Sequence, residues 1–165
     1  MSQQAHTSKH TEPEAGRPTM PVGYGVPEGT AGVLPWSWLD TRLSAARNYW
    51  VGTTRPDGRP HAMPVWGVWV EGRLYFGTDP QSRKGRNLST NPAVVVHLES
   101  GDEVVIVEGV AEETPDNPAL HARIEEAYHA KYKTRDVGNY VVRPRVVFAW
   151  SQFPADVTRW QFSDD

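Results

Sequence analysis

Apolar residues recur along this chain first with the period of a helix and then with the period of strands. After Pro35, the residues Trp36, Leu39, Leu43 and Ala46 stand three or four positions apart. Residues at this spacing share one face of an α-helix, and a proline is favoured where a helix begins. The pattern therefore predicts a helix that begins near Pro35 and buries one apolar stripe.

Runs rich in β-branched and aromatic residues follow, separated by short turns that contain Gly, Pro, Asp or Asn. Such runs are typical of strands joined as hairpins. The predicted strands cover residues 49–54, 60–70, 73–78, 93–99, 103–112, 145–151 and 157–162. Both faces of the second run are apolar, which predicts a strand that is covered on both sides.

Two further helices interrupt the predicted strands. The first covers Arg83–Thr90 and stops at Asn91, because a residue that precedes a proline disfavours the helical conformation. The second follows residues 116–118 and has an apolar face formed by Leu120, Ile124, Ala127 and Tyr128. Helices that flank hairpin-connected strands indicate a mainly β protein of the α+β class, with an antiparallel sheet closed as a barrel.

The first 30 residues differ from the rest of the chain. They are polar, contain repeated Gly and Pro, and show no apolar period. This composition predicts a mobile N-terminal tail over residues 1–30. Residues 31–165 are then long enough for one domain with its own core.

Composition and charge narrow the classes of function. The 165 residues include no cysteine, which excludes disulfides, zinc–thiolate sites and thiol nucleophiles. Acidic residues outnumber basic ones by 20 to 17, which argues against a nucleic-acid partner. No apolar run is long enough for a membrane span or a signal peptide, so we expect a cytoplasmic protein without a membrane partner.

One stretch, from Tyr75 to Leu88, combines a strand end, a polar turn and a basic helix start. Three cations, Arg83, Lys84 and Arg86, stand close together at the start of the predicted helix. Free N–H groups at a helix N-terminus attract a phosphate, and cationic side chains can complete such a site. The local pattern fits a solvated basic corner equally well, so the residues of this stretch alone leave both interpretations open.

Other candidate sites are weaker. His121, Glu125 and His129 share one helix face, but the two histidines lie about 12 Å apart at 1.5 Å per residue, too far for one metal ion. We therefore interpret this face as solvated and predict no metal site. The chain contains no Gly-x-Ser-x-Gly motif, and Ser82 lies among cations, which fits an anion ligand better than a catalytic triad.

An ordered series of motifs resembles one known family. The motifs are Arg59–Trp69, Leu74–Thr78, Ser82–Leu88, Asn91-Pro92 and Thr158–Trp160. They resemble the split-barrel flavin- and deazaflavin-dependent oxidoreductases related to pyridoxamine 5'-phosphate oxidase, over about residues 35–163. The resemblance implies an antiparallel six-stranded split β-barrel that forms a homodimer, with the cofactor in a groove between the two subunits.

The same resemblance implies which residues bind the cofactor. The phosphate would lie at the turn and helix start that follow the third strand, and the ring would lie along the strand from Met63 to Trp66. Arg159 and Trp160 would approach from the partner subunit. The expected cofactor-binding residues are Met63, Pro64, Val65, Trp66, Gly77, Thr78, Ser82, Arg83, Lys84, Arg159 and Trp160.

The chain departs from the true pyridoxamine 5'-phosphate oxidases in three places. Arg159-Trp160-Gln161 stands where those enzymes have Arg-x-His. No arginine occurs near Ala62 and Met63, and a glutamine usual at the flavin edge is replaced around Val104. Vitamin B6 oxidation is therefore not expected. The pattern is more similar to the actinobacterial branch, many of whose members bind the deazaflavin F420 instead of FMN.

We therefore expect an oxidoreductase that uses F420, with FMN as the alternative, and transfers a hydride between the ring and a small conjugated organic acceptor. The cofactor supplies this chemistry, so no essential catalytic acid or base is predicted. Two alternatives remain open. One is a non-catalytic carrier or sensor that binds a flavin or F420. The other is a haem-binding relative of the barrel, which would need a histidine ligand such as His61, His97, His121 or His129.

Overall fold

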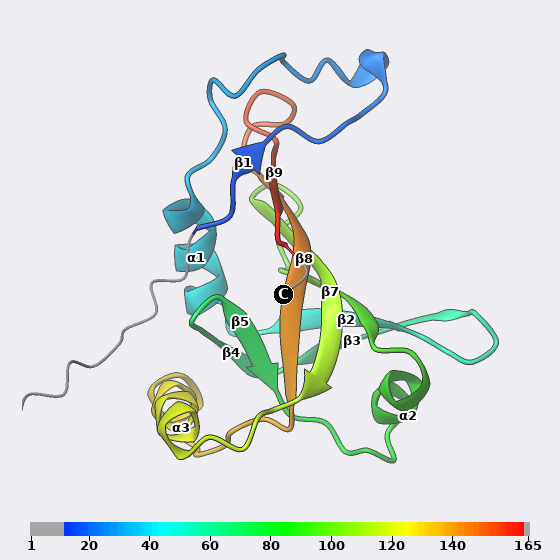
Figure 1. Cartoon of the computed structure of the whole chain (residues 1–165), viewed down its shortest axis with the longest axis vertical. Coiled ribbons are helices and arrows are strands. Elements are labelled where there is room, and N and C mark those ends of the chain that lie inside the picture. Colours follow the sequence, from blue (N-terminus) through cyan, green and yellow to red (C-terminus); the bar gives the residue numbers. More distant parts are fainter. Residues whose placement is uncertain (1–11, 164–165) are drawn as a thin grey trace, which may run out of the picture.

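A single antiparallel sheet forms the centre of the computed structural model, which describes residues 12–163, and helices lie around it (Figure 1). The helices in this range are α1 (Trp36–Ala45), α2 (Arg83–Thr90) and α3 (Pro118–Tyr132), with a short 3-10 turn, η1, at Val22–Tyr24. The strands are β1 (Ala15–Gly16), β2 (Tyr49–Thr54), β3 (Pro60–Val65), β4 (Gly67–Val70), β5 (Arg73–Phe76), β6 (Ala93–His97), β7 (Val104–Glu113), β8 (Tyr140–Trp150) and β9 (Thr158–Gln161).

The sheet confirms the mainly β, antiparallel class but not the expected six strands. Within residues 12–163 it has nine strands, in the order β1-β9-β8-β7-β6-β2-β3, and β5 pairs with both β8 and β4. No ladder joins β3 to β4, so the sheet is not closed. The helices α1 and α2 and the strand β2 have nearly the predicted bounds, because Pro35 precedes α1, Ser82 and Asn91-Pro92 flank α2, and a turn follows β2.

The predicted strand over residues 60–70 is two strands, and this prediction was wrong. β3 pairs with β2, whereas β4 pairs with β5, so the chain changes its partner strand at Trp66. Gly67 permits this bend, because a Cβ there would lie 2.9 Å from the carbonyl oxygen of Tyr75. The expected burial on both faces holds for β4 only. In this chain β3 is an edge strand, and Met63 on it is 48% exposed.

The strand β8 is longer than predicted, because the sequence prediction began the strand only after a proline that in fact lies within it. It begins at Tyr140, five residues before the expected start, and Pro144 lies within it. The β7–β8 ladder shifts its register here, because Glu108 is opposite Val146 whereas Gly109 is opposite Pro144, so β8 contains one extra residue next to the proline. Such a β-bulge interrupts the ladder locally, which allows a proline without an N–H group in a long strand.

Two apolar clusters hold the helices to the sheet. The larger one packs Leu39 and Leu43 of α1 against residues of β2, β6, β7 and β8. The smaller one packs Ile124 and Tyr128 of α3 against Tyr75 of β5 and its neighbours. Burial of large apolar side chains stabilises a fold by about 1.5–3 kcal/mol each. The clusters therefore fix α1 and α3 on the sheet and hold β5, which leads into α2.

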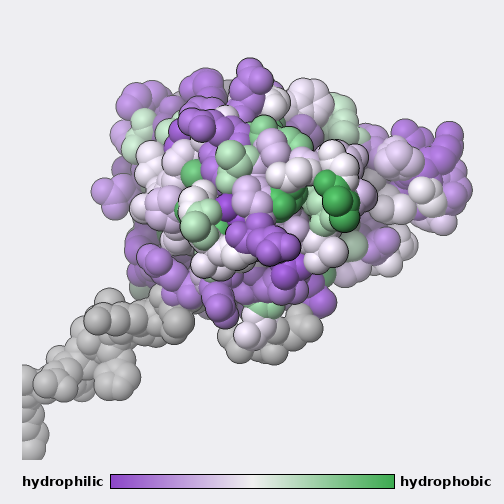
Figure 2. All heavy atoms as spheres, turned by 90° about the horizontal axis from the view of Figure 1, so that it is seen from above, coloured by the Kyte–Doolittle hydropathy of each residue, from purple (hydrophilic) through white to green (hydrophobic). Residues whose placement is uncertain are grey.

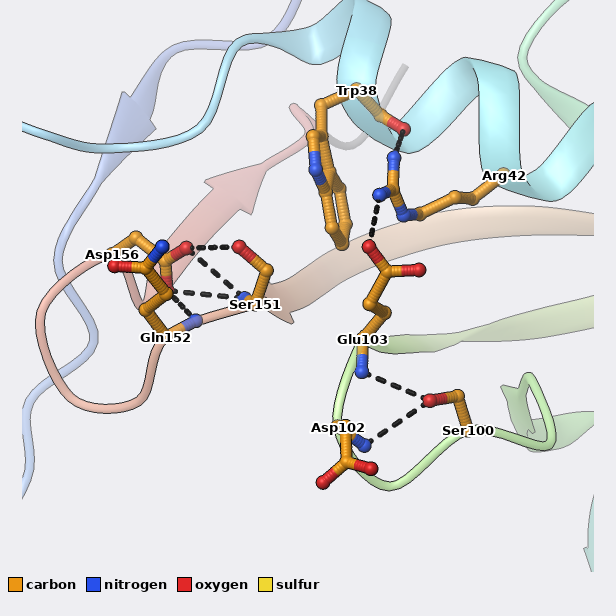
Figure 3. A network of polar contacts seen from close by, with 8 residues as sticks. All are labelled: Trp38, Arg42, Ser100, Asp102, Glu103, Ser151, Gln152 and Asp156. Atoms are coloured by element: carbon orange, nitrogen blue, oxygen red, sulfur yellow. Dashed lines mark hydrogen bonds and ion pairs between the residues drawn. The ribbon is translucent and has the colours of Figure 1, made fainter.

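Polar contacts attach α1 to the turn between β6 and β7 (Figure 3). The guanidinium of Arg42 lies 3.6 Å above the ring of Trp38 and forms an ion pair with Glu103. Ser100 accepts hydrogen bonds from the backbone N–H groups of Asp102 and Glu103, which closes the turn. This turn lies in sequence directly before β7, so the contacts help to hold the start of that strand.

The segment before α1 contacts the sheet at its β9 edge. β1 pairs with β9, and the guanidinium of Arg17 donates to the carbonyls of Gly29, Ala31, Ala155 and Val157. Figure 1 shows this segment beside the loop that joins β8 to β9. Residues 1–11 of the expected tail lie outside the described residues. Its mobility in solution stays a prediction, but residues 15–17, Gly29 and Ala31 have contacts that the polar composition did not indicate.

The surface seen in Figure 2 is mainly hydrophilic, with small apolar groups separated by polar side chains. Among residues 12–163, no helix has both the length and the apolar character that crossing a membrane requires.

Candidate functional site

The basic stretch is a strand end, a tight turn and the N-terminus of α2, as the sequence predicts. Ser82 is the N-cap of α2, and its side chain accepts a hydrogen bond from the backbone N–H of Gly85 at 3.0 Å. The hydroxyls of Thr78 and Ser82 also share a hydrogen bond at 3.0 Å. Only glycine fits at position 85, because a Cβ there would lie 2.7 Å from atoms of Pro80. The loop before α2 therefore packs closely against the first turn of that helix.

Lys84 is the most unusual residue of this helix start. Its side chain is only 8% exposed and has no hydrogen-bond or ion-pair partner within residues 12–163. Burial without a partner lowers the pKa of its ammonium group. A cation that is partly shielded from water and has no anionic partner costs stability, which an anionic ligand would offset. The burial of Lys84 therefore favours the anion site over the solvated basic corner.

A cavity of about 690 Å³ opens beside Lys84. This volume lies in the range of sites for small molecules and cofactors. Its lining comes from the bend between β3 and β4, from the turn after β5, from α2, from α3 and from the loop between α3 and β8. The residues that line it are Pro64, Val65, Trp66, Gly77, Thr78, Asp79, Lys84, Tyr128, Thr134, Asp136, Val137, Gly138 and Asn139. Six of the eleven expected cofactor-binding residues are among them.

The loop before β8 forms a wall of this cavity that the motifs did not reveal. Asn139 accepts a hydrogen bond from the backbone N–H of Thr78 and donates one to its carbonyl, both at 2.8 Å. Gly138 has φ +63°, and a Cβ there would lie 2.9 Å from backbone atoms of Phe76. The one sequence signal was the Gly138-Asn139 pair, which marks a turn but does not show which strand it contacts.

An aromatic and cationic stack lies beside the bend between β3 and β4. The rings of Trp66 and Tyr132 are stacked with centroids 4.6 Å apart, and the guanidinium of Arg47 lies 5.6 Å from the Trp66 ring. Trp66 is still 50% exposed, so one side of this indole is open to a ligand or to another protein surface. Planar ligands are commonly bound against such rings.

The remaining expected cofactor-binding residues lie outside the cavity lining. Met63 and Arg83 are exposed beside it, on β3 and α2, and Ser82 acts as the N-cap. Trp160 is 1% exposed, and its ring packs edge-to-face on Trp36 at 5.7 Å. This burial assigns Trp160 to the core of its own chain, and its expected approach to a partner's cofactor stays a prediction.

Arg159 lies at a different place from the other expected residues. It lines a broad groove of about 1460 Å³ between the N-terminal segment and strands β7 to β9. This groove also contains carboxylates, such as Glu71 and Glu112, and the second of these forms an ion pair with Arg143. The structure of one chain therefore does not bring Arg159 to Lys84. A contribution of Arg159 across a dimer interface stays a prediction.

The fold resembles several solved structures. A haem-binding protein from Mycobacterium smegmatis superposes with a TM-score of 0.61 at 20% identity, over 78% of this chain and 59% of that chain. A structure described as an F420 reductase superposes with a TM-score of 0.52 at 25% identity, over 77% of this chain and 100% of that chain. An FAD-binding protein from Mesorhizobium loti gives 0.55 at 20% identity, over 79% and 96%.

Sequence comparison gives the family. No curated protein matches the chain in a sequence search. A family model described as "Pyridoxamine 5'-phosphate oxidase" matches residues 39–156, most of the chain and all of the elements that surround the cavity. The chain therefore belongs to the pyridoxamine 5'-phosphate oxidase family, as the order of its motifs from Arg59 to Trp160 predicted.

Proposed function

We propose that this protein is an oxidoreductase that binds a phosphorylated deazaflavin, F420, or alternatively FMN, in the cavity beside Lys84. The single observation that carries the proposal is the buried Lys84 side chain, which has no partner among the described residues and lines the cavity at the N-terminus of α2. A phosphate group there would be attracted by the positive charge of Lys84 and would accept hydrogen bonds from the free N–H groups at the start of α2.

The residues around Lys84 fit a phosphate in two further ways. The hydroxyls of Thr78 and Ser82 are already joined to each other, so they can turn one donor toward a bound oxygen without moving the backbone. Arg83 is exposed at the first position of α2 and adds a second cation near the same end. Charge-assisted hydrogen bonds of this kind are about twice as strong as neutral ones.

The ring of the cofactor would lie along Pro64–Trp66. These residues form the bend at the cavity, and the exposed side of Trp66 offers an apolar surface. Stacking on Tyr132 holds the indole in one orientation. A flavin-type cofactor supplies hydride transfer when bound, and the chain's own contribution is to orient the ring and to exclude water from it. The acceptor of the hydride would be a small conjugated organic molecule.

We also propose a homodimer with the cofactor at the subunit interface. In the single chain β3 is an edge strand whose exposed side chains include Met63, and Trp66 is half exposed. Exposed apolar side chains on an edge strand favour association with another surface. Sedimentation analysis of the wild type and of Met63→Glu tests this proposal, and dissociation of the variant into monomers is the expected result.

Cofactor titration tests the proposed function most directly. Lys84→Ala should weaken the binding of F420 or FMN about tenfold or more, because loss of one buried charge-assisted contact costs about 1.5–3 kcal/mol. The matched control is Arg86→Ala, which removes an exposed cation from the same helix and should change the affinity less than threefold. Equal affinity of wild type and Lys84→Ala, with both variants folded, would refute the phosphate site.

The absorption spectrum of the purified protein distinguishes the cofactors, since flavin, deazaflavin and haem have separate bands. Turnover with an added electron acceptor distinguishes the oxidoreductase from a carrier or sensor that uses the same cavity.

A further inference from the structure

Three side chains of the β2–β3 hairpin face α2. Thr53 and His61 are direct partners in the β2–β3 ladder, so their side chains lie on the same face of the sheet. Arg55 follows Thr53 by two residues, and the hydrogen bond from its N–H to the carbonyl of Arg59 continues the ladder beyond β2. This face is the one that α2 covers, because Asn87 of α2 donates a hydrogen bond to the Thr53 hydroxyl at 3.0 Å.

Lys84 belongs to the same group of side chains. It lies three residues before Asn87, which places the two side chains on one face of α2. Both are buried, and Asn87 is fully so. The buried face of α2 and the hairpin therefore meet with Lys84, Arg55 and His61 around the Asn87–Thr53 hydrogen bond.

Burial, and after it nearby positive charges, lower the pKa of the His61 imidazole. Among the described residues, these charges come from Arg55 on the hairpin and from Lys84 and Arg83 on α2. The carboxylate at the hairpin tip, Asp57, is occupied by Arg59, which donates to it through both its backbone and its guanidinium. The hydrogen bonds from Arg59 lower the pKa of this carboxyl, and the charges of Arg55 and Arg83 contribute to the same lowering.

Three polar atoms in this group are buried without a hydrogen-bond partner in the part of the chain that the structure describes. They are Nε of Arg55, Nδ1 of His61 and Oδ1 of Asn87. Buried polar atoms in proteins are almost always paired, so each such atom requires an explanation. Two of the three can donate to an anion, and they lie beside the unpaired ammonium of Lys84. An anion with several oxygens would satisfy the donors and balance the positive charge.

We propose that the phosphate site has two halves, one on α2 and one on the β2–β3 hairpin, and that a bound phosphate causes His61 to take up a proton from solvent. The helical half is Lys84 with the N-terminus of α2, and the hairpin half is Arg55 with His61. The inference rests on the proposed cofactor site, because it assigns two further residues and a proton to it. A phosphate placed between the two halves reverses the sign of the field at His61. The charged imidazolium, disfavoured in the empty site, then becomes the favoured form.

Proton uptake on His61 has a direct readout that needs no turnover. The imidazole resonances of the wild-type protein are titrated by NMR in the absence and in the presence of inorganic phosphate, and His61 is assigned by the signal that His61→Gln lacks. The midpoint of the His61 titration should rise by about one pH unit or more with phosphate, because an opposite charge in contact favours the charged form. An unchanged midpoint at saturating phosphate would overturn the inference.

Cofactor binding provides the second readout. Between pH 8 and pH 6, FMN and F420 titrations should show an affinity gain in the wild type that exceeds the gain in His61→Gln by severalfold, up to about tenfold. This comparison cancels the titration of the phosphate itself. His129→Gln, at an exposed histidine of α3, is the matched control and should behave as the wild type. Arg55→Gln should weaken binding at both pH values, and riboflavin, which lacks the phosphate, should show no dependence on His61.

The outcomes separate this inference from the proposed function. If Lys84→Ala loses cofactor affinity while His61→Gln keeps the wild-type pH dependence, the cofactor site stands and the hairpin half is refuted. If neither FMN nor F420 binds at any pH, the proposed function fails, and the NMR titration with inorganic phosphate alone decides whether the two halves form an anion site. Binding of only one cofactor with the predicted His61 dependence supports the inference and identifies the natural source of the phosphate.

Discussion

The side-chain amide of Asn139 is joined to the backbone of Thr78 by two hydrogen bonds of 2.8 Å each: its oxygen accepts one from the N–H of Thr78, and its NH₂ donates one to the carbonyl of Thr78. These bonds connect residues 61 positions apart and hold the loop before β8 against the turn before α2. Both segments line the same cavity, so the width of the proposed site depends on this pair of contacts.

Asn139→Asp should therefore weaken cofactor binding. The carboxylate keeps the acceptor for the Thr78 N–H but loses the donor to its carbonyl, and it adds a negative charge beside a phosphate site. We expect affinity for FMN or F420 to fall about fivefold to fiftyfold, which corresponds to one lost hydrogen bond plus repulsion. Fluorescence titration gives the affinity. Asn91→Asp, in the turn after α2, is the control, and a loss of the same size there would contradict the specific role of Asn139.

Gly85→Ala should disrupt the start of α2. The new Cβ would lie 2.7 Å from atoms of Pro80, and neither backbone segment can move without opening the turn. Overpacking of this kind costs about 1–3 kcal/mol of unfolding free energy. Denaturant unfolding measures the cost, and cofactor affinity should fall as well.

The control for this substitution is Gly101→Ala. A Cβ at Gly101 would have nothing within 4 Å, so its unfolding free energy should stay within about 0.5 kcal/mol of the wild type. Equal stability of the two variants would show that the turn before α2 is not rigid.

Tyr132→Phe should loosen the bend between β3 and β4 and leave the stacking on Trp66 intact. The Tyr132 hydroxyl accepts a hydrogen bond from the Gly67 N–H at 3.0 Å and donates to the carbonyl of Arg47 at 2.7 Å. Its loss leaves buried backbone groups unpaired, which costs about 1–3 kcal/mol. Chemical denaturation should show this drop in the unfolding free energy. Tyr24→Phe, at an exposed tyrosine, should leave the unfolding free energy unchanged.

Lys131 should make stability depend on pH in the alkaline range. Its ammonium donates to Ala46, Tyr49 and Gly67, which are uncharged acceptors, and burial lowers its pKa from 10.5 to about 8. Between these values the unfolded chain binds more protons than the folded one. This group therefore raises the unfolding free energy as pH rises from about 8 to 10.

The substitution Lys131→Met should remove this rise, and Lys133→Met, at the exposed end of the same helix, should retain it. The window ends near pH 10, where buried tyrosines such as Tyr49, whose pKa burial raises, begin to act in the opposite direction. Urea denaturation at pH 7.5, 8.5 and 9.5 tests the slope, and a flat wild-type profile would contradict the buried cation.

Arg17→Ala should release the segment before α1. The guanidinium connects the carbonyls of Gly29 and Ala31 to those of Ala155 and Val157. Without it, hydrogen exchange should become faster in residues 29–33 and 155–157 while the central strands stay protected. Arg123→Ala, which removes an exposed ion pair with Glu71, is the control. Unchanged exchange in the variant would mean that β1 alone holds the segment.

The local sequence determined the ends of several elements, because the residues that start or stop them are neighbours along the chain. The end of α2 followed from Asn91-Pro92, and the structure adds Ser82 as the N-cap at its start and Gly58, with φ +85°, in the turn of the β2–β3 hairpin. The bend at Trp66 was not visible. It depends on which strand each half of the run pairs with, and pairing partners lie far away in the sequence.

The features of the candidate site also fall into those that the local sequence sets and those that the tertiary structure sets. The sequence by itself determined the family, the helix start with its cations, and six of the thirteen residues that line the cavity. Only the tertiary structure decided that Lys84 is buried without a partner, that Trp160 belongs to the core, and that Arg55 and His61 face α2. The physical reason is that burial and charge environment are set by residues that the fold brings together, whereas caps and turns are set by neighbours along the chain.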